Sequence, residues 1–118
     1  MRFKVLYHVS PKRNLKSIDK YGLEIGRRSP VIELRLWGSK TTTKRNVIYF
    51  TDRAGISVVI RGWVSCPVVV FKVKVPVNWL EKLESEVHGY FGGEANEWVS
   101  LKSIPRKYIT HAFDVPGC

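Results

Sequence analysis

The sequence lacks the long apolar run that a membrane-spanning helix needs. None of its apolar segments approaches the roughly 20 consecutive apolar residues that cross a bilayer. The longest, VVIRGWVSCPVVVF, is interrupted by Arg61, Gly62 and Pro67. The N-terminal stretch MRFKVLYHVS also lacks the extended apolar core and the small-residue cleavage site of a signal peptide. These absences predict an intracellular, cytoplasmic protein without a membrane partner.

Cysteine is scarce, and its spacing argues against a zinc site. Cys66 and Cys118 form neither a CxxC pair nor a cluster with histidine at metal-ligand spacing. The three histidines, His8, His88 and His111, are far apart in the chain. The sequence therefore predicts two free thiols and no bound metal.

Acidic residues are outnumbered by basic ones. Twenty Lys and Arg against ten Asp and Glu give a net charge of +10 and a sequence pI of about 9.9. A charge of this size attracts polyanions whatever the fold, and a domain pI above about 9 is typical of nucleic-acid-binding proteins. A basic proteome or a solvated basic surface is the alternative explanation. The absence of glutamine, with only four asparagines, is typical of organisms that grow at high temperature.

The chain is long enough for one domain with a substantial core. A chain of 118 residues buries roughly two thirds of its unfolded surface, and no repeat, linker or low-complexity segment divides it. Alternating apolar and polar residues predict a strand over 3–10. Ser10 and Pro11 match the N-cap and first position of a helix, and Gly22 matches the glycine that follows the last helical turn.

The rest of the chain is predicted to be richer in strands than in helices. Asp52 is placed to cap a helix over 53–63, the polar segment 38–46 indicates a loop, and 77–87 is compatible with a short helix. The sum is an α+β domain with two early helices, most strands in the second half, and mixed or antiparallel sheets. Further strands are predicted over 31–37, 47–51, 67–75, 97–104 and 108–115.

Three short segments resemble the signature of the ADP-ribosyltransferase fold. LYHVS lies on the first predicted strand, VIYFTDR precedes a predicted helix, and NEWVSLKSI opens a late strand. In the diphtheria-toxin-like and poly(ADP-ribose) polymerase-like branch, such segments supply a His, a Tyr and a Glu, matched here by His8, Tyr49 and Glu97. A serine eight positions after the family tyrosine contacts the nicotinamide amide in the polymerases, which implies that role for Ser57. Ile60 stands where their second stacking tyrosine would be.

The DNA thymidine ADP-ribosyltransferase toxins resemble the chain over more of its length. The pattern YH…NL.SI…GL starts at Tyr7, YF..R ends at Arg53, and E…vP..YI starts at Glu97. The arginine of the second pattern is catalytically important in those toxins, which implies a catalytic role for Arg53. Each motif is short, and it is their combination and order that are specific. The chain is shorter than either relative, which puts their substrate-binding insertions in doubt.

The resemblance implies a fold, a chemistry and partners. The fold would be α+β, with ADP-ribosyltransferase-like split mixed or antiparallel sheets and short flanking helices. The implied cofactor is NAD, and with the net charge of the chain the implied acceptor is nucleic acid, single-stranded DNA or RNA.

Breaking the nicotinamide–ribose bond of NAD+ develops positive charge on the sugar. A carboxylate at ~4 Å would stabilise it by on the order of 4 kcal/mol at an effective dielectric constant of 20. Glu97 is expected to be that catalytic carboxylate, Tyr49 to stack on the nicotinamide ring, and His8 to bond a ribose. His8 and Glu97 are expected on adjacent strands of a split sheet. Arg27 and Arg28 form a basic turn that suits the pyrophosphate.

Each of these residues also has an ordinary structural explanation. His8 suits a half-buried strand, and Tyr49 suits a strand aromatic with its ring in the core. Glu97 can point into water, as Glu usually does, and Glu94 is a competing carboxylate. Arg53 suits a surface residue at a helix start or a phosphate contact.

Two other functions therefore stay open. One is a basic nucleic-acid-binding module without catalysis. The other is an RNA 2′-phosphotransferase, although the arginine and paired-histidine motifs of that family are not evident here. Convergence of His8, Tyr49 and Glu97 around one cleft would separate an enzyme from a binding module.

Overall fold

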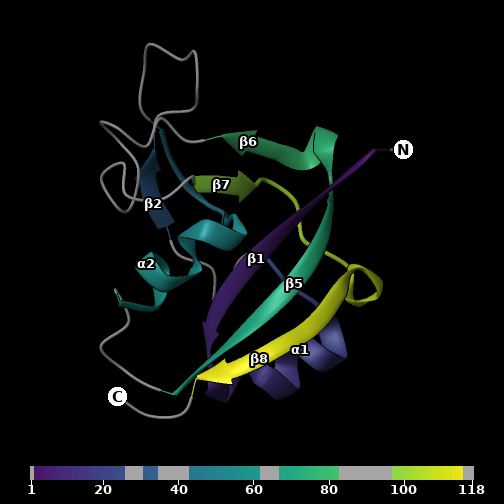
Figure 1. The fold of residues 1–118 in the computed structure, drawn as a ribbon. Helices are drawn as coiled ribbons and strands as arrows, with labels where there is room; N and C mark the ends of the chain where they lie inside the picture. Colours follow the sequence, from purple (N-terminus) through teal and green to yellow (C-terminus); the bar gives the residue numbers. More distant parts are fainter. Residues whose placement is uncertain (1, 26–30, 35–42, 62–66, 83–96, 116–118) are drawn as a thin grey trace.

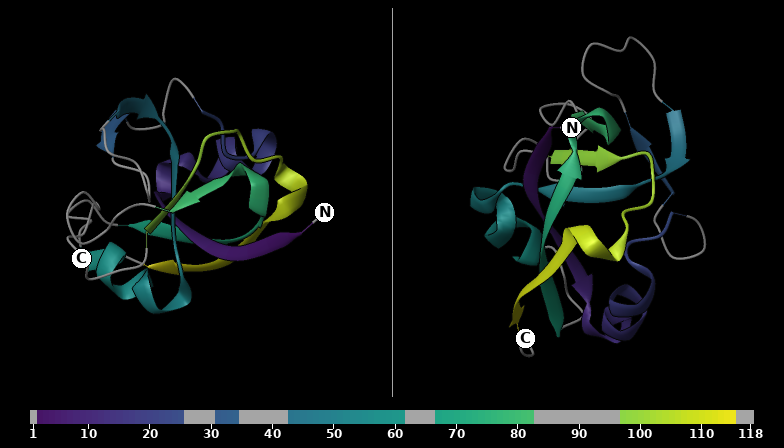
Figure 2. Two further views of the ribbon diagram at one scale, coloured as in Figure 1. Left: turned by 90° about the horizontal axis from the view of Figure 1, so that it is seen from above. Right: turned by 90° about the vertical axis from the view of Figure 1, so that its right-hand side faces the viewer.

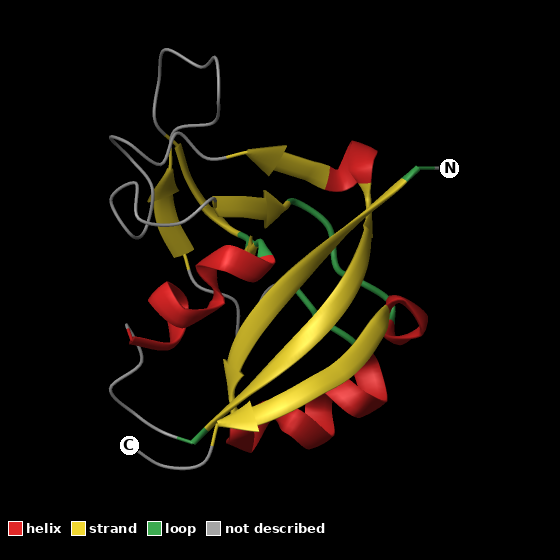
Figure 3. Ribbon diagram, in the orientation of Figure 1, coloured by secondary structure: helices red, strands yellow, loops and turns green. Residues whose placement is uncertain are grey.

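The computed structural model describes residues 2–25, 31–34, 43–61, 67–82 and 97–115. Its strands are β1 (Phe3–Pro11), β2 (Val31–Leu34), β3 (Thr43–Asn46), β4 (Ile48–Thr51), β5 (Val68–Pro76), β6 (Leu80–Lys82), β7 (Glu97–Ser100) and β8 (Ile109–Val115). Its α-helices are α1 (Leu15–Tyr21) and α2 (Ile56–Arg61), and its 3₁₀ turns are η1 (Lys12–Asn14), η2 (Arg53–Gly55), η3 (Val77–Trp79) and η4 (Arg106–Tyr108). Together they make a small α+β fold (Figures 1 and 3).

A six-stranded antiparallel sheet organises this fold, with strands in the order β6-β7-β4-β1-β5-β8. Its longest pair is β1 with β5, which runs from Phe3 opposite Pro76 to Pro11 opposite Val68. β2 and β3 form a separate two-stranded sheet. The α+β class and the antiparallel sheet predicted from the sequence are confirmed, and the strands predicted at 3–10 and 67–75 match β1 and β5 within a residue.

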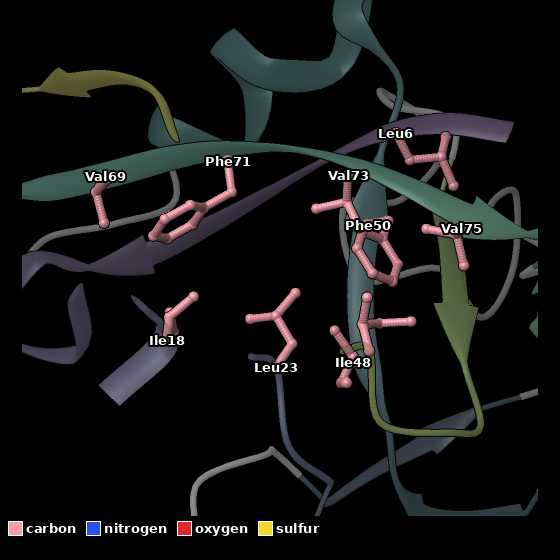
Figure 4. Close-up of a cluster of buried hydrophobic side chains, with 10 residues drawn as sticks. Leu6, Ile18, Leu23, Ile48, Phe50, Val69, Phe71, Val73 and Val75 are labelled. Carbon is pink, nitrogen blue, oxygen red and sulfur yellow. The ribbon is translucent and has the colours of Figure 1, made fainter. Parts of the chain in front are cut away.

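Side chains of the sheet alternate between two apolar layers, because successive residues of a strand point to opposite faces. Figure 4 shows the larger layer, in which Phe71 lies over Ile18 of α1 and Phe50 lies beside Val73 and Ile48. We call this side the α1 face. On the other side, Val70 packs with Ile56 of α2, and we call it the α2 face. The view from above in Figure 2 shows the sheet between the two helices.

The first helix begins later than Ser10 and Pro11 predicted. β1 continues through Pro11, and the Lys12 N–H donates to the Pro67 carbonyl at 3.1 Å, which extends the pairing with the β5 segment. Ser10 is buried, and its hydroxyl accepts from the Asn14 side-chain amide at 3.2 Å instead of capping a helix. Strand pairing therefore overrides the local helix signal. The predicted end is confirmed, because Gly22 follows α1 with its N–H on the Ile18 carbonyl at 2.9 Å.

Three further predictions were wrong within the described residues. The polar segment 38–46 ends in β3, because its last four residues pair with β2. Residues 80–82 are strand β6 and not helix, because they pair with β7. The described strands also divide evenly, four before α2 and four after it. Residues 35–42 and 83–96 lie outside the described part of the chain.

Asp52 caps the turn that leads into α2, as the sequence predicted. Its Oδ1 accepts from the Gly55 N–H at 2.8 Å. We expect Asp52→Ala to lower the free energy of unfolding by about 1 kcal/mol, because the Gly55 N–H loses its side-chain acceptor. Asp52→Asn keeps an acceptor and should stay close to wild type in urea denaturation. Equal losses in the two variants would contradict the capping role.

In the helices that the structure describes, no segment is long and apolar enough to cross a membrane.

Candidate functional site

The two central strands of the large sheet, β4 and β1, pair at a single position. β1 and β4 pair at Tyr7 opposite Thr51, whereas β1 and β5 pair along the whole of β1. In Figure 1, β1, β5 and β8 run together on a diagonal, while β6 and β7 cross the view at a different angle. Beyond Tyr7 and Thr51, side chains of one strand can reach backbone groups of the other.

His8 occupies this junction. Its Nδ1 lies 2.8 Å from the Tyr49 carbonyl oxygen, and its ring meets the Phe50 ring edge-on, with centroids 5.9 Å apart. A carbonyl oxygen only accepts hydrogen bonds, so Nδ1 must carry the hydrogen. In the neutral ring this leaves Nε2 as an acceptor, because a backbone partner on one ring nitrogen fixes the tautomer of the other.

Burial favours the neutral form of His8. Desolvation lowers its pKa from the ordinary value of 6.5, and the hydrogen bond to the Tyr49 carbonyl raises the pKa by less. At neutral pH the ring is therefore uncharged, and Nε2 can accept a hydrogen bond from a hydroxyl group. This chemistry suits a sugar hydroxyl better than a phosphate.

The lowered pKa of His8 predicts a pH dependence of stability. The unfolded chain binds a proton near pH 6.5 that the folded chain binds less readily, so stability falls as the pH drops below about 6.5. We expect wild type to lose up to about 1.4 kcal/mol per pH unit more than His8→Asn in that window. The asparagine amide can still donate to the Tyr49 carbonyl but does not titrate. Parallel urea-stability curves for the two proteins between pH 7 and 5 would contradict this.

Tyr49 and His8 use opposite faces of the sheet. The Tyr49 side chain packs on the α2 side, against the clusters that contain Val59 and Val99. His8 is paired with Phe71, whose side chain belongs to the α1 face, so strand alternation puts His8 on that face. His8 therefore contacts the backbone of Tyr49 and not its ring.

Glu97 begins β7, which lies beside β4 in the sheet. Its Cα is opposite Thr51, which is itself opposite Tyr7 of β1. At about 5 Å between paired Cα atoms, Glu97 lies about 10 Å from Tyr7. Tyr7 and Thr51 belong to the α2 face, as Tyr49 does, and Glu97 holds the next register position of this row. β4 separates the strands of His8 and Glu97, so the prediction that these two strands are adjacent is wrong.

Of the other site residues predicted from the sequence, two follow β4 on the side of α2, and the rest lie outside the described residues. Arg53 lies in η2 and Ser57 in α2, and both are exposed on the segment that follows β4. Arg27 and Arg28 lie outside the described residues, as does Glu94. Among the residues that the structure does describe, no three His, Cys, Asp or Glu are grouped as metal ligands.

Thr51 is a site residue that sequence reasoning did not single out. It is buried at the junction and pairs with both Tyr7 and Glu97. The signal that could have found it is its place two residues after Tyr49, on the same face of β4.

Comparisons with known proteins gave no relative. No family model matches the sequence, and neither the curated proteins nor the solved structures contain a significant match.

Proposed function

We propose that the chain is an NAD-dependent ADP-ribosyltransferase that modifies nucleic acid. One observation carries the proposal: the His8 imidazole is hydrogen-bonded to the Tyr49 carbonyl at 2.8 Å, and Glu97 is on the next strand. Three motif residues from distant parts of the sequence thus occupy the neighbouring strands β1, β4 and β7. Their side chains do not all converge, because His8 uses the face of the sheet opposite to Tyr49, so it is the shared strands and not a common cleft that support the proposal.

In the proposal, individual groups near the junction bind separate parts of NAD+, with His8 on the α1 face and Tyr49 on the α2 face. Neutral His8 offers Nε2 as an acceptor for a ribose hydroxyl, and its tautomer is held by the Tyr49 carbonyl. Arg53 is an exposed cation just beyond β4 and suits the pyrophosphate or the acceptor backbone. Ser57, from the motif spacing, and Arg27 and Arg28, from their basic turn, complete the proposed binding set.

NAD+ supplies the ADP-ribosyl group and the nicotinamide leaving group. The bond between ribose C1′ and the nicotinamide nitrogen breaks, and its electron pair leaves with nicotinamide. In the proposal, the Glu97 carboxylate stabilises the positive charge on the sugar. A nucleophile of the acceptor base then bonds to C1′, and its proton passes to the Glu97 carboxylate, which acts as general base.

Nicotinamide release tests the proposal. The protein is incubated with NAD+, alone and with mixed single-stranded DNA and RNA oligonucleotides, and free nicotinamide is quantified by chromatography. We expect release that rises when oligonucleotide is added. Intact NAD+ in every mixture would contradict the enzyme assignment.

A non-catalytic basic binding module is the second candidate, and one observation favours it. The side chains of His8 and Tyr49 use opposite faces of the sheet, as a structural histidine and a core tyrosine would. Oligonucleotide binding without nicotinamide release is its signature. An RNA 2′-phosphotransferase also consumes NAD+ but uses a phosphate as the nucleophile, so an RNA carrying a 2′-phosphate is included among the acceptors.

A further inference from the structure

The α2 face of β1, β5 and β8 carries exposed apolar and basic side chains. Helix α2 packs near the Val68 end of β5, and towards the other end no described element covers this face, which is turned to the viewer in Figure 1. Large apolar side chains stand exposed there: Val5 at 44%, Phe113 at 43%, and Phe3 at 43%, whose ring also contacts the Tyr108 ring with centroids 5.3 Å apart. The strand register also places the exposed residues Lys72, Lys74 and Thr110 on it. We call these six residues the open face.

The open face has an ordered pattern along β5. Phe113 is opposite Val70, Lys72 and Lys74 follow on β5, and Phe3 is opposite Pro76. Each step is two residues, or about 6.7 Å, so the two aromatic positions are about 20 Å apart along β5, with both cations between them. Because β8 and β1 flank β5, ring, cation, cation and ring follow a diagonal across the three strands.

The positive charge of the open face is uncompensated among the described residues of these three strands. Their only carboxylate, Asp114, is opposite Val69 and therefore belongs to the α1 face. Its Oδ1 lies 2.8 Å from His111 Nε2. An anionic partner is therefore the one whose charge complements this surface.

The open face is continuous with the candidate site. One cross-strand row runs through five strands, Glu97–Thr51–Tyr7–Lys72–Thr110. Three strand spacings of about 5 Å separate Glu97 from Lys72, which puts their Cα atoms about 15 Å apart. A chain that lies on the open face can therefore extend along the sheet to Glu97.

We propose that the open face binds single-stranded nucleic acid and delivers it to the Glu97 end of this row. Lys72 and Lys74 contact successive phosphates, and unpaired bases stack on the Phe3 and Phe113 rings. A duplex keeps its bases stacked on one another and cannot use these rings, so single strands are preferred. The delivery step rests on the proposed function, whereas the binding step does not.

The test measures binding of labelled single-stranded DNA and RNA by fluorescence anisotropy, without NAD+, over a range of salt concentrations. Removing two phosphate contacts in Lys72→Gln/Lys74→Gln should weaken binding about 25-fold at 0.1 M salt and reduce the slope of log K against log salt by about 1.4. The matched control is Lys12→Gln/Lys16→Gln, which removes the same charge from exposed positions of η1 and α1. Equal effects of the two double variants, or no binding by wild type, would overturn the proposal.

Two further variants separate stacking from charge and binding from catalysis. Phe113→Leu keeps an apolar side chain but removes the ring, and we expect binding about tenfold weaker with an unchanged salt slope. Glu97→Gln should bind oligonucleotide at least as well as wild type, because no phosphate contact is lost. If binding depends on Lys72 and Lys74 but NAD+ is never consumed, nucleic-acid binding by the open face is supported and the enzyme assignment is wrong. Tighter binding of a duplex than of its single strands would overturn the stacking assignment.

Discussion

Replacing Glu97 by glutamine should lower the rate of nicotinamide release from NAD+ by about 10²–10³-fold. Glutamine keeps the size and shape of the side chain and removes its negative charge. The sugar cation that develops as nicotinamide departs would then lose its nearest counter-charge, and the acceptor would lose its base. Binding of NAD+ should change much less than the rate, because the carboxylate acts mainly on charge that appears in the transition state.

Two other glutamates provide the controls for this result. Glu94→Gln changes the neighbouring carboxylate in the sequence, and Glu81→Gln changes an exposed carboxylate on β6. Both variants should keep wild-type rates, measured as single-turnover nicotinamide release at saturating NAD+. A full rate in Glu97→Gln together with a loss in Glu94→Gln would move the catalytic carboxylate to Glu94.

Gly22→Ala should lower the free energy of unfolding by about 3 kcal/mol. Gly22 has φ of 79° and ψ of −161°, a backbone conformation that only glycine adopts readily, and other residues there lose about 1–3 kcal/mol. An added Cβ would also come within 2.3 Å of the Ile104 carbonyl oxygen, and crowding of this kind costs about 1–3 kcal/mol. Backbone cannot move aside as a flexible side chain would, so both penalties apply.

The backbone bridge beside Gly22 explains why the chain comes so close there. The Leu23 N–H donates to the Ile104 carbonyl at 3.0 Å, and the Ile104 N–H donates to the Leu23 carbonyl at 2.8 Å. Urea denaturation checks the expected loss, with Lys20→Ala on exposed α1 surface as the control, for which a change within about 0.5 kcal/mol is expected. If Gly22→Ala were as stable as that control, the positive φ and the close approach would both be wrong.

Local signals in the sequence predicted local structure well. The β-branched run that became β5, the cap at Asp52 and the end of α1 at Gly22 each depend on residues within a few positions of one another. The late start of α1 and the strand β6 were missed because they depend on distant partners. Pro11 stays in β1 through its pairing with Val68, and residues 80–82 become strand through β7.

The sequence motifs identified candidate residues for the site but not the face of the sheet on which each side chain lies. His8, Tyr49 and Glu97 were singled out by order and spacing, and they lie on the neighbouring strands β1, β4 and β7. The face of each side chain could not be predicted, because β4 carries apolar residues on both faces and Leu6 adds an apolar residue to the more polar face of β1. The pairing of Tyr7 with Thr51, which aligns the site with Lys72, depends on register across three strands.

The most direct test of the central claim is the mass of the acceptor. Mixed single-stranded DNA and RNA oligonucleotides are incubated with NAD+ and either wild type or Glu97→Gln, then analysed by mass spectrometry. We expect an oligonucleotide to gain one ADP-ribose unit with wild type only. Unmodified oligonucleotides beside intact NAD+, with binding retained, would contradict it and leave a basic nucleic-acid-binding module in its place.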